Sequence, residues 1–146
     1  MKIGEMRYPE SIISTMIAPC GMNCVLCMGY LRDLREKNHC LGCHDDAANL
    51  PKSCAMCIIR NCVEFSTGEK SFCYECGKFP CLRLRQLDKR YRTKYGMSMI
   101  ANLESIQEIG LEAFVAHERD RWKCPECGGV ICVHRTNCIF CGHPRD

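Results

Sequence analysis

The sequence predicts a small α+β protein that is stabilised by metal ions as well as by apolar packing. Three observations support this fold class. Sixteen of the 146 residues are cysteine, far more than in ordinary proteins. Six cysteine pairs have the spacing C-x2-C, which suits a turn around one tetrahedral metal ion. The long stretch without cysteine, residues 82–123, has the apolar spacing of amphipathic helices.

We divide the chain into three regions. Residues 1–95 are predicted to form a cysteine-rich metal-binding region of knuckles and short helices, with a basic helix at its end. Residues 96–122 form a helical connector, and residues 123–146 form a zinc ribbon with a short β-hairpin. Eleven cysteines lie in the first region and five in the last. Because large apolar side chains are few in the region of the first eleven cysteines, bound metal must supply folding energy there.

Four helices are predicted. The first covers residues 25–37, where apolar side chains recur every four residues, and the second covers residues 81–95 and ends at Gly96. Ser98 caps the third, which ends at Gly110, and the fourth follows that glycine. Their stripes, which are apolar except for Glu118, are expected to pack in the core: Leu84, Leu87, Tyr91 and Tyr95, then Met99, Leu103 and Ile106, then Leu111, Phe114, Val115, Glu118 and Trp122.

The clearest motif lies in residues 122–144, where two C-x-x-C pairs, each followed by glycine, are separated by ten residues. This pattern resembles a zinc ribbon, with a strand over residues 129–134 and Cys124, Cys127, Cys138 and Cys141 as ligands. Four thiolates complete a tetrahedron, so the site would be structural. A single iron of the rubredoxin type is the alternative metal. Cys132 is expected to be a buried spare thiol, and His134 and His143 are expected to be exposed.

The N-terminal cysteines predict one or two further metal sites. Pairing neighbours in the sequence joins two or three of Cys20, Cys24 and Cys27 with Cys40 and Cys43, and Cys57 and Cys62 with two of Cys73, Cys76 and Cys81. His39, His44 and Cys54 are further candidate ligands. The whole chain would then hold two or three zinc ions. The spacing C-x3-C-x2-C of Cys20, Cys24 and Cys27 also suits three corners of an iron–sulfur cluster, so one cluster plus zinc is the alternative.

The order PCGMNCVLC, CLGC, CIIRNC and SFCYECGKFPC resembles an uncharacterised prokaryotic cysteine-rich family, domain of unknown function 3795. The likeness covers roughly residues 17–123. It includes Gly21, Gly42, Ile59, Arg60, Phe72, Phe79, Pro80 and every cysteine between Cys20 and Cys81 except Cys54. The resemblance implies metal binding and assigns no activity.

The segment LRLRQLDKRYRTKY, residues 82–95, is the candidate for contact with nucleic acid. It carries six basic side chains against the single acid Asp88. The basic residues are Arg83, Arg85, Lys89, Arg90, Arg92 and Lys94. A helix of this composition can contact phosphates, but a solvated helix face that balances thiolate charge is the alternative. The net charge of +3 indicates little, because thiolates bound to metal are negative.

The sequence favours a binding protein over an enzyme, because no nucleophile–base–acid set is evident. No apolar run is long enough for a membrane span, and reduced thiols suit the cytoplasm, so we expect a soluble cytoplasmic protein. The leading hypothesis is a zinc-binding protein whose metal sites are mainly structural and present a surface to a macromolecular partner. The alternatives are an iron–sulfur redox or cluster-carrying protein and a nucleic-acid-binding accessory protein.

Overall fold

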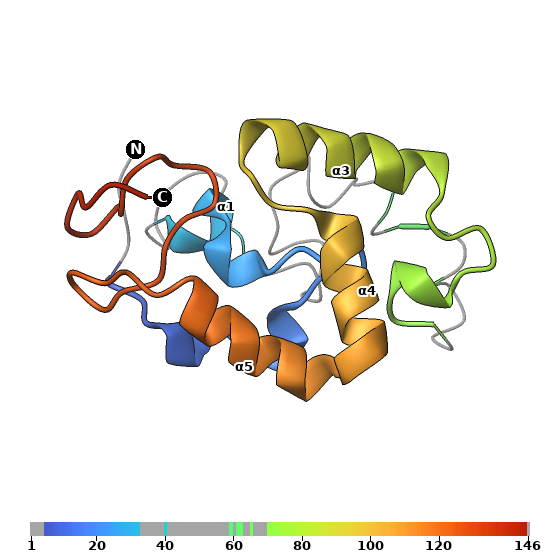
Figure 1. Cartoon of the computed structure of the whole chain (residues 1–146), viewed down its shortest axis with the longest axis horizontal. Coiled ribbons are helices and arrows are strands. Elements are labelled where there is room, and N and C mark those ends of the chain that lie inside the picture. Colours follow the sequence, from blue (N-terminus) through green and yellow to red (C-terminus); the bar gives the residue numbers. More distant parts are fainter. Residues whose placement is uncertain are drawn as a thin grey trace.

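The computed structural model describes residues 5–32, 40, 59, 61, 62, 65 and 70–145 of the chain. Three helices longer than two turns follow one another in its second half: α3 (Leu82–Lys94), α4 (Met99–Ile109) and α5 (Leu111–Arg121). The short elements are η1 (Pro9–Ser11), η2 (Ser14–Met16), η3 (Cys24–Leu26), α1 (Met28–Leu31) and η6 (Cys73–Glu75), where η denotes a 3-10 helix. Figure 1 shows α4 lying between α3 and α5.

The three long helices confirm the predictions for residues 81–95, 98–110 and 111–122 to within one or two residues. Ser98 caps α4 as expected, since its Oγ accepts a hydrogen bond from the N–H of Ala101 at 3.0 Å. Gly110 lies between α4 and α5 with φ +90°. The apolar stripes face inward, and Leu84, Leu103 and Val115 are among the fully buried side chains.

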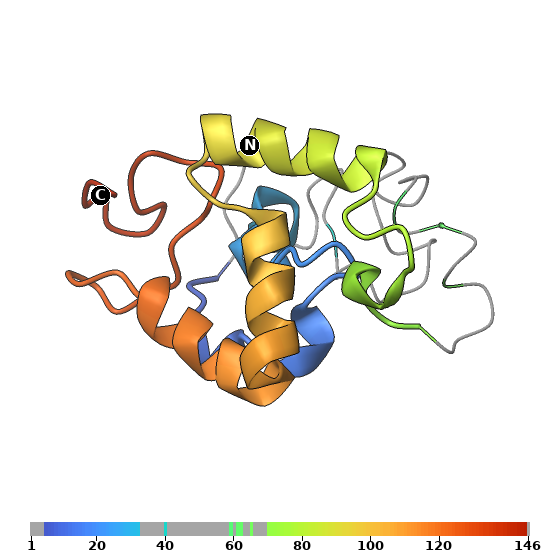
Figure 2. The same ribbon diagram turned by 45° about the vertical axis from the view of Figure 1, so that its right-hand side comes forward.

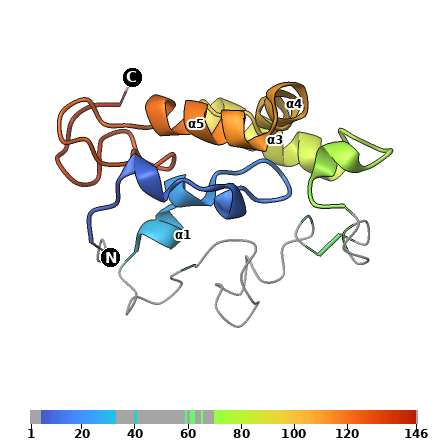
Figure 3. The ribbon, with the colours of Figure 1, turned by 90° about the horizontal axis from the view of Figure 1, so that it is seen from below.

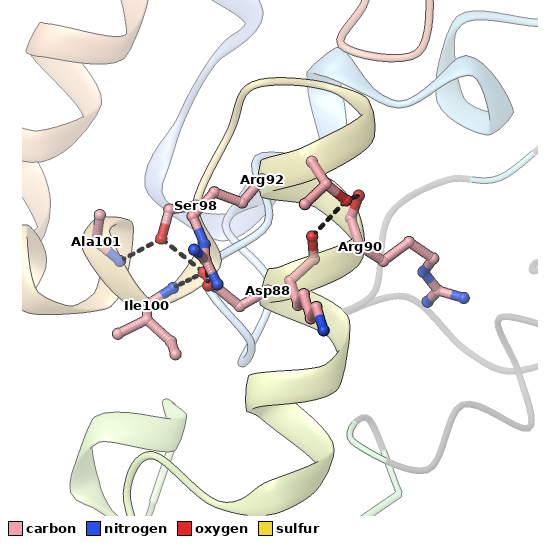
Figure 4. A network of polar contacts seen from close by, with 8 residues as sticks. Asp88, Arg90, Arg92, Ser98, Ile100 and Ala101 are labelled. Carbon is pink, nitrogen blue, oxygen red and sulfur yellow. Dashed lines mark hydrogen bonds and ion pairs between the residues drawn. The ribbon is translucent and has the colours of Figure 1, made fainter.

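A buried carboxylate fixes the junction between α3 and α4 (Figure 4). Asp88 is 4% exposed, and its Oδ1 accepts hydrogen bonds from the Ser98 hydroxyl at 2.6 Å and the Ile100 N–H at 3.0 Å. Its Oδ2 accepts from Nε of Arg92 at 3.0 Å. Burial would raise the pKa of Asp88, but these three partners bring it below its ordinary value. The only acid of the basic segment is therefore already neutralised inside the fold.

The N-terminal segment, residues 5–32, packs against one side of the three long helices (Figures 2 and 3). Residues of η1 and η2 contact α5, and η6 contacts α4. Gly21 approaches α4 closely, and its carbonyl accepts a hydrogen bond from Nδ2 of the buried Asn102 at 3.0 Å. Buried side chains from both halves of the chain therefore share one hydrophobic core.

The C-terminal segment, residues 123–145, hydrogen-bonds to distant parts of the backbone. The N–H of Val130 donates to the carbonyl of Arg7 at 2.9 Å, and that of Val133 donates to the carbonyl of Leu26 at 3.0 Å. The N–H of Ile131 donates to Trp122 at 2.8 Å. Because neighbouring residues have partners in different segments, no continuous ladder forms. Within the described residues there is no strand, and the predicted β-hairpin is replaced by isolated bridges. The described fold is small, helical and cysteine-rich.

The predicted helix over residues 25–37 is confirmed at Met28–Leu31 and is wrong at residues 25–27 and at Arg32. Residues 24–26 form the 3-10 turn η3, Cys27 is extended, and α1 covers only Met28–Leu31. Arg32 is extended and ends the helix. The Gly29 carbonyl accepts the N–H of Cys40 at 2.8 Å, which places Cys40 beside α1. Residues 33–37 lie outside the described part. No helix among the described residues is long and apolar enough to cross a membrane.

Candidate metal centre

Two loops of the C-terminal segment have the same backbone hydrogen bonds. In the first, the N–H of Cys124 donates to the carbonyl of Gly129 at 2.8 Å, and the N–H of Gly128 donates back to Cys124 at 3.0 Å. In the second, the N–H of Cys138 donates to the residue five positions further on, and the N–H of Gly142 donates back to Cys138, both at 2.8 Å. The sequence repeat C-x-x-C-G is therefore also a structural repeat.

The two loops bring four thiols together. The Sγ atoms of Cys124, Cys127, Cys138 and Cys141 all lie within 4.8 Å of one another. Cys124 and Cys141 are 3.6 Å apart, and Cys127 and Cys138 are 3.7 Å apart. A disulfide requires about 2.05 Å, so these pairs are not bonded. Four sulfurs around one zinc, each about 2.3 Å from the metal, would lie about 3.8 Å from one another. The four cysteines could therefore hold a metal ion.

The pKa values and the exposure of the thiols in this cluster differ from one cysteine to the next. A hydrogen bond from the backbone N–H of Cys127 lowers the pKa of Cys124 to about 6. Desolvation raises the pKa of Cys127 to about 12. The N–H of Gly129 lies 3.4 Å from Sγ of Cys127 and donates to it. Cys124 and Cys138 are buried, whereas Cys141 is exposed. A metal ion would displace the remaining thiol protons, because thiolates are the ligands.

The N-terminal cysteines come from several turns that the backbone ties together. Cys24, Cys40 and Cys73 are buried, while Cys20, Cys27, Cys62, Cys76 and Cys81 are half-buried. The N–H of Cys73 donates to the carbonyl of Pro19 at 2.9 Å. This bond brings the 73–76 knuckle beside the group of Cys20, Cys24 and Cys27. The pairing of sequence neighbours would assign these two groups to different metal sites.

Several N-terminal candidates lie outside the described residues: His39, Cys43, His44, Cys54 and Cys57. In the part of the chain that the structure describes, the C-terminal four are the one group of at least three potential ligands within this distance. How the N-terminal thiols divide among sites therefore stays a prediction.

Sequence reasoning missed a polar contact between the C-terminal segment and α3. His134, expected to be exposed, is partly buried, and its Nδ1 accepts the N–H of Met28 at 3.2 Å. Its Nε2 lies 2.8 Å from the Tyr91 hydroxyl. Burial lowers the pKa of His134 to about 4, so the ring is neutral and Nε2–H donates to Tyr91. Burial also raises the pKa of Tyr91, as do the charges of Cys27 and Cys20. No sequence pattern indicated this pair.

Cys132 is buried as predicted and lies outside the four-thiol cluster. Its Sγ is 3.9 Å from Sδ of Met28, which makes it part of the contact between the C-terminal segment and α1. Burial raises the pKa of this thiol. Cys132 therefore behaves as a small apolar side chain.

The basic side chains of α3 are all exposed. This set comprises Arg83, Arg85, Lys89, Arg90, Arg92 and Lys94. Arg92 pairs with Asp88, which is turned into the α3–α4 junction (Figure 4). The outer surface of α3 is therefore positive without a neighbouring acid on the same helix.

Comparison with known proteins identifies one family. Residues 16–86 match a family described as "Protein of unknown function (DUF3795)", which confirms the resemblance seen in the cysteine motifs. The match ends within α3, so the predicted likeness of residues 87–123 stays a prediction. No curated protein and no solved structure matches the chain.

Proposed function

We propose that the protein binds a structural zinc ion through Cys124, Cys127, Cys138 and Cys141. The family that residues 16–86 match has no assigned function, so the proposal starts from the C-terminal site. The observation that carries this proposal is the convergence of four thiols from two equivalent loops, at sulfur–sulfur distances of 3.6 and 3.7 Å. Four thiolates leave no open coordination position for a substrate. The bound ion would hold the two loops in place.

The proposed role of the metal is to build a surface for a macromolecular partner. The C-terminal segment has only isolated bridges among the described residues, so a metal ion would replace the stability that a sheet gives. Binding energy of a structural zinc is also folding energy, about 10 kcal/mol or more in small peptides. Iron in the same four-thiolate site is the competing occupant.

The first experiment is to purify the protein without oxygen, count zinc and iron per chain and record the visible spectrum. Replacement of Cys138 by Ala should remove one metal ion per chain. Replacement of Cys132 by Ala is the matched control, because Cys132 is also buried but is not in the cluster. A Cys138→Ala protein that keeps the full metal content would refute the site.

The same metal count tests the N-terminal region. A colourless protein with two or three zinc ions supports structural zinc sites throughout. A brown protein with about four irons and one zinc supports an iron–sulfur cluster that uses Cys20, Cys24 and Cys27. In that case the function becomes electron transfer or cluster delivery, and the zinc site keeps its structural role.

The second candidate function is binding of nucleic acid by α3. The observation that favours it is the exposure of all six basic side chains while Asp88 is buried and paired. Replacing Arg85, Lys89 and Lys94 by Gln leaves the Asp88–Arg92 pair intact and preserves helix propensity. The variant should lose salt-sensitive binding to a mixed-sequence RNA or DNA oligonucleotide, with circular dichroism as the folding control. Equal binding by the variant and the unmodified protein would eliminate this role.

A further inference from the structure

A cavity of about 270 Å³ lies beside the C-terminal cluster. Its walls come from three places: the end of α5 at Arg121 and Trp122, the loop between α3 and α4 at Gly96, and the C-terminal segment at Lys123 and Arg145. This volume is near the lower limit for small-molecule sites. It suits a single charged group or a small metabolite.

The lining of this cavity is positively charged. It contains Arg121, Lys123 and Arg145 together with His143, and no acidic residue is part of it. Within the described residues, neither Lys123 nor Arg145 forms an ion pair, and the contact of Arg121 with Glu118 is long, at 4.0 Å. Like charges held together without a counter-ion repel one another. An anion in the cavity would relieve this repulsion.

The arginines are held in position before any ligand arrives. Arg145 donates hydrogen bonds from Nη1 to the carbonyls of Val133 at 2.9 Å and Arg135 at 3.3 Å, and from Nη2 to the carbonyl of Tyr95. Its Cζ lies 5.2 Å from the ring centre of Trp122, and that of Arg121 lies 4.7 Å from it. Cations stack favourably on an indole at such distances. Arg145 is thus held by hydrogen bonds and by stacking, whereas Arg121 is held by stacking on Trp122 and by its long contact with Glu118.

We propose that this cavity is a binding site for a phosphate group, with Lys123, Arg121 and Arg145 as its cations. Three cations, one at the end of α5 and two on the C-terminal segment, match a tetrahedral dianion, whose oxygens point in several directions, better than they match a single carboxylate. Arginine offers paired donors that suit phosphate, and lysine adds a flexible point charge. The phosphate can come from a free monoester or from a nucleic-acid backbone.

A different role for the same cations is to balance the metal site. One zinc with four thiolates carries a charge of about −2. The Lys123 side chain lies along the first loop, and its Cε is 4.0 Å from where a Cβ on Gly128 would be. If charge balance were its main role, removal of Lys123 would weaken metal retention and leave phosphate binding unchanged.

The test uses the full chain with its metal. Trp122 is the only tryptophan and lines the cavity, so its fluorescence reports on ligand binding. Inorganic phosphate is titrated at constant ionic strength, and calorimetry supplies an independent affinity. Lys123 is exposed, so Lys123→Gln should fold normally. Loss of one charged contact should weaken phosphate binding about tenfold. Lys78→Gln removes the same charge at an exposed position that does not line the cavity, and it should have no effect.

Two outcomes would overturn the proposal. The first is the absence of saturable phosphate binding up to about 20 mM, since a charge-paired site should bind more tightly than that. The second is equal phosphate binding by Lys123→Gln and the unmodified protein. Metal content of each variant is measured alongside, because metal loss in Lys123→Gln with unchanged phosphate affinity assigns Lys123 to charge balance. Adenosine monophosphate and a short oligonucleotide without terminal phosphate identify the source. Binding of the monophosphate alone indicates a free monoester, and binding of the oligonucleotide in a Lys123-dependent manner indicates a nucleic-acid backbone.

Discussion

Substitution of Gly21 by Ala should destabilise the protein because this residue is in close contact with α4. Gly21 has φ +90°. A Cβ at this position would lie 2.8 Å from the carbonyl oxygen of Met99 and 2.9 Å from Cγ of Leu103. The first neighbour is backbone, and the second is a fully buried side chain. Neither can move away without disturbing the core.

The size of the effect follows from two contributions. Forcing a residue with a Cβ to positive φ costs about 1–2 kcal/mol, and overpacking a tight site costs about 1–3 kcal/mol. Gly21→Ala should therefore lower the free energy of unfolding by about 2–5 kcal/mol. Gly110 is the matched control, because it has the same φ of +90° and no atom within 4 Å of the added Cβ. Gly110→Ala should incur only the conformational cost.

The assay is urea unfolding followed by circular dichroism, with both variants saturated with the same metal so that occupancy does not differ. Metal content is also measured, since Gly21 separates Cys20 from Cys24. Equal loss of stability in the two variants, within about 0.5 kcal/mol, would refute the reasoning. It would mean that the N-terminal turn does not rest on α4 as closely as the distances state.

Three further predictions concern buried polar groups. Burial raises the pKa of Glu118 above its ordinary value of 4.5. Its contribution to stability is therefore complete below pH 4.5 and is lost as pH rises through the pKa of the folded state. In thermal unfolding, Glu118→Gln should be more stable than the unmodified protein at pH 7, and the difference should vanish near pH 4. The pKa of Asp88 is lowered, so its contribution is present at neutral pH and is lost as pH falls through the folded value. Asp88→Asn, which sets an amide against Arg92, should cost about 1–3 kcal/mol at pH 7 in urea unfolding and less below pH 4, and a constant difference would contradict the network. Tyr91→Phe removes the hydrogen bond to His134 and should cost about 1 kcal/mol, whereas an unchanged midpoint of unfolding would show that this bond adds no stability.

The long helices could be predicted because their signals are local. An apolar stripe, a capping Ser98 and glycines at positions 96 and 110 all lie within the segment that they define. The two C-terminal knuckles are also local, since each is closed by hydrogen bonds within six residues. Physical forces that act within one or two turns of chain leave a readable pattern in the sequence.

The remaining features depend on contacts between distant residues. His134 is partly buried because Met28 and Tyr91 meet it from other segments. Asp88 looks like an ordinary solvent-facing acid until α4 supplies Ser98 and Ile100. The expected strand over residues 129–134 does not form for the same reason. The N–H groups of Val130 and Val133 donate to Arg7 and Leu26, which lie in two different segments, and not to one partner strand. Periodicity cannot reveal a partner that is a hundred residues away.

These distant bonds also define what a metal ion in the C-terminal site could control. Lys123 and Arg145 line the cavity from the C-terminal segment that carries the two knuckles, while Arg121 and Gly96 come from the helical part. If the knuckles opened, Arg145 would lose its carbonyl partners at Val133 and Arg135, which belong to the segment between the loops. The cations would then separate, and their repulsion would no longer favour an anion. Metal occupancy and phosphate binding are therefore expected to be thermodynamically linked, with each ligand tightening the binding of the other.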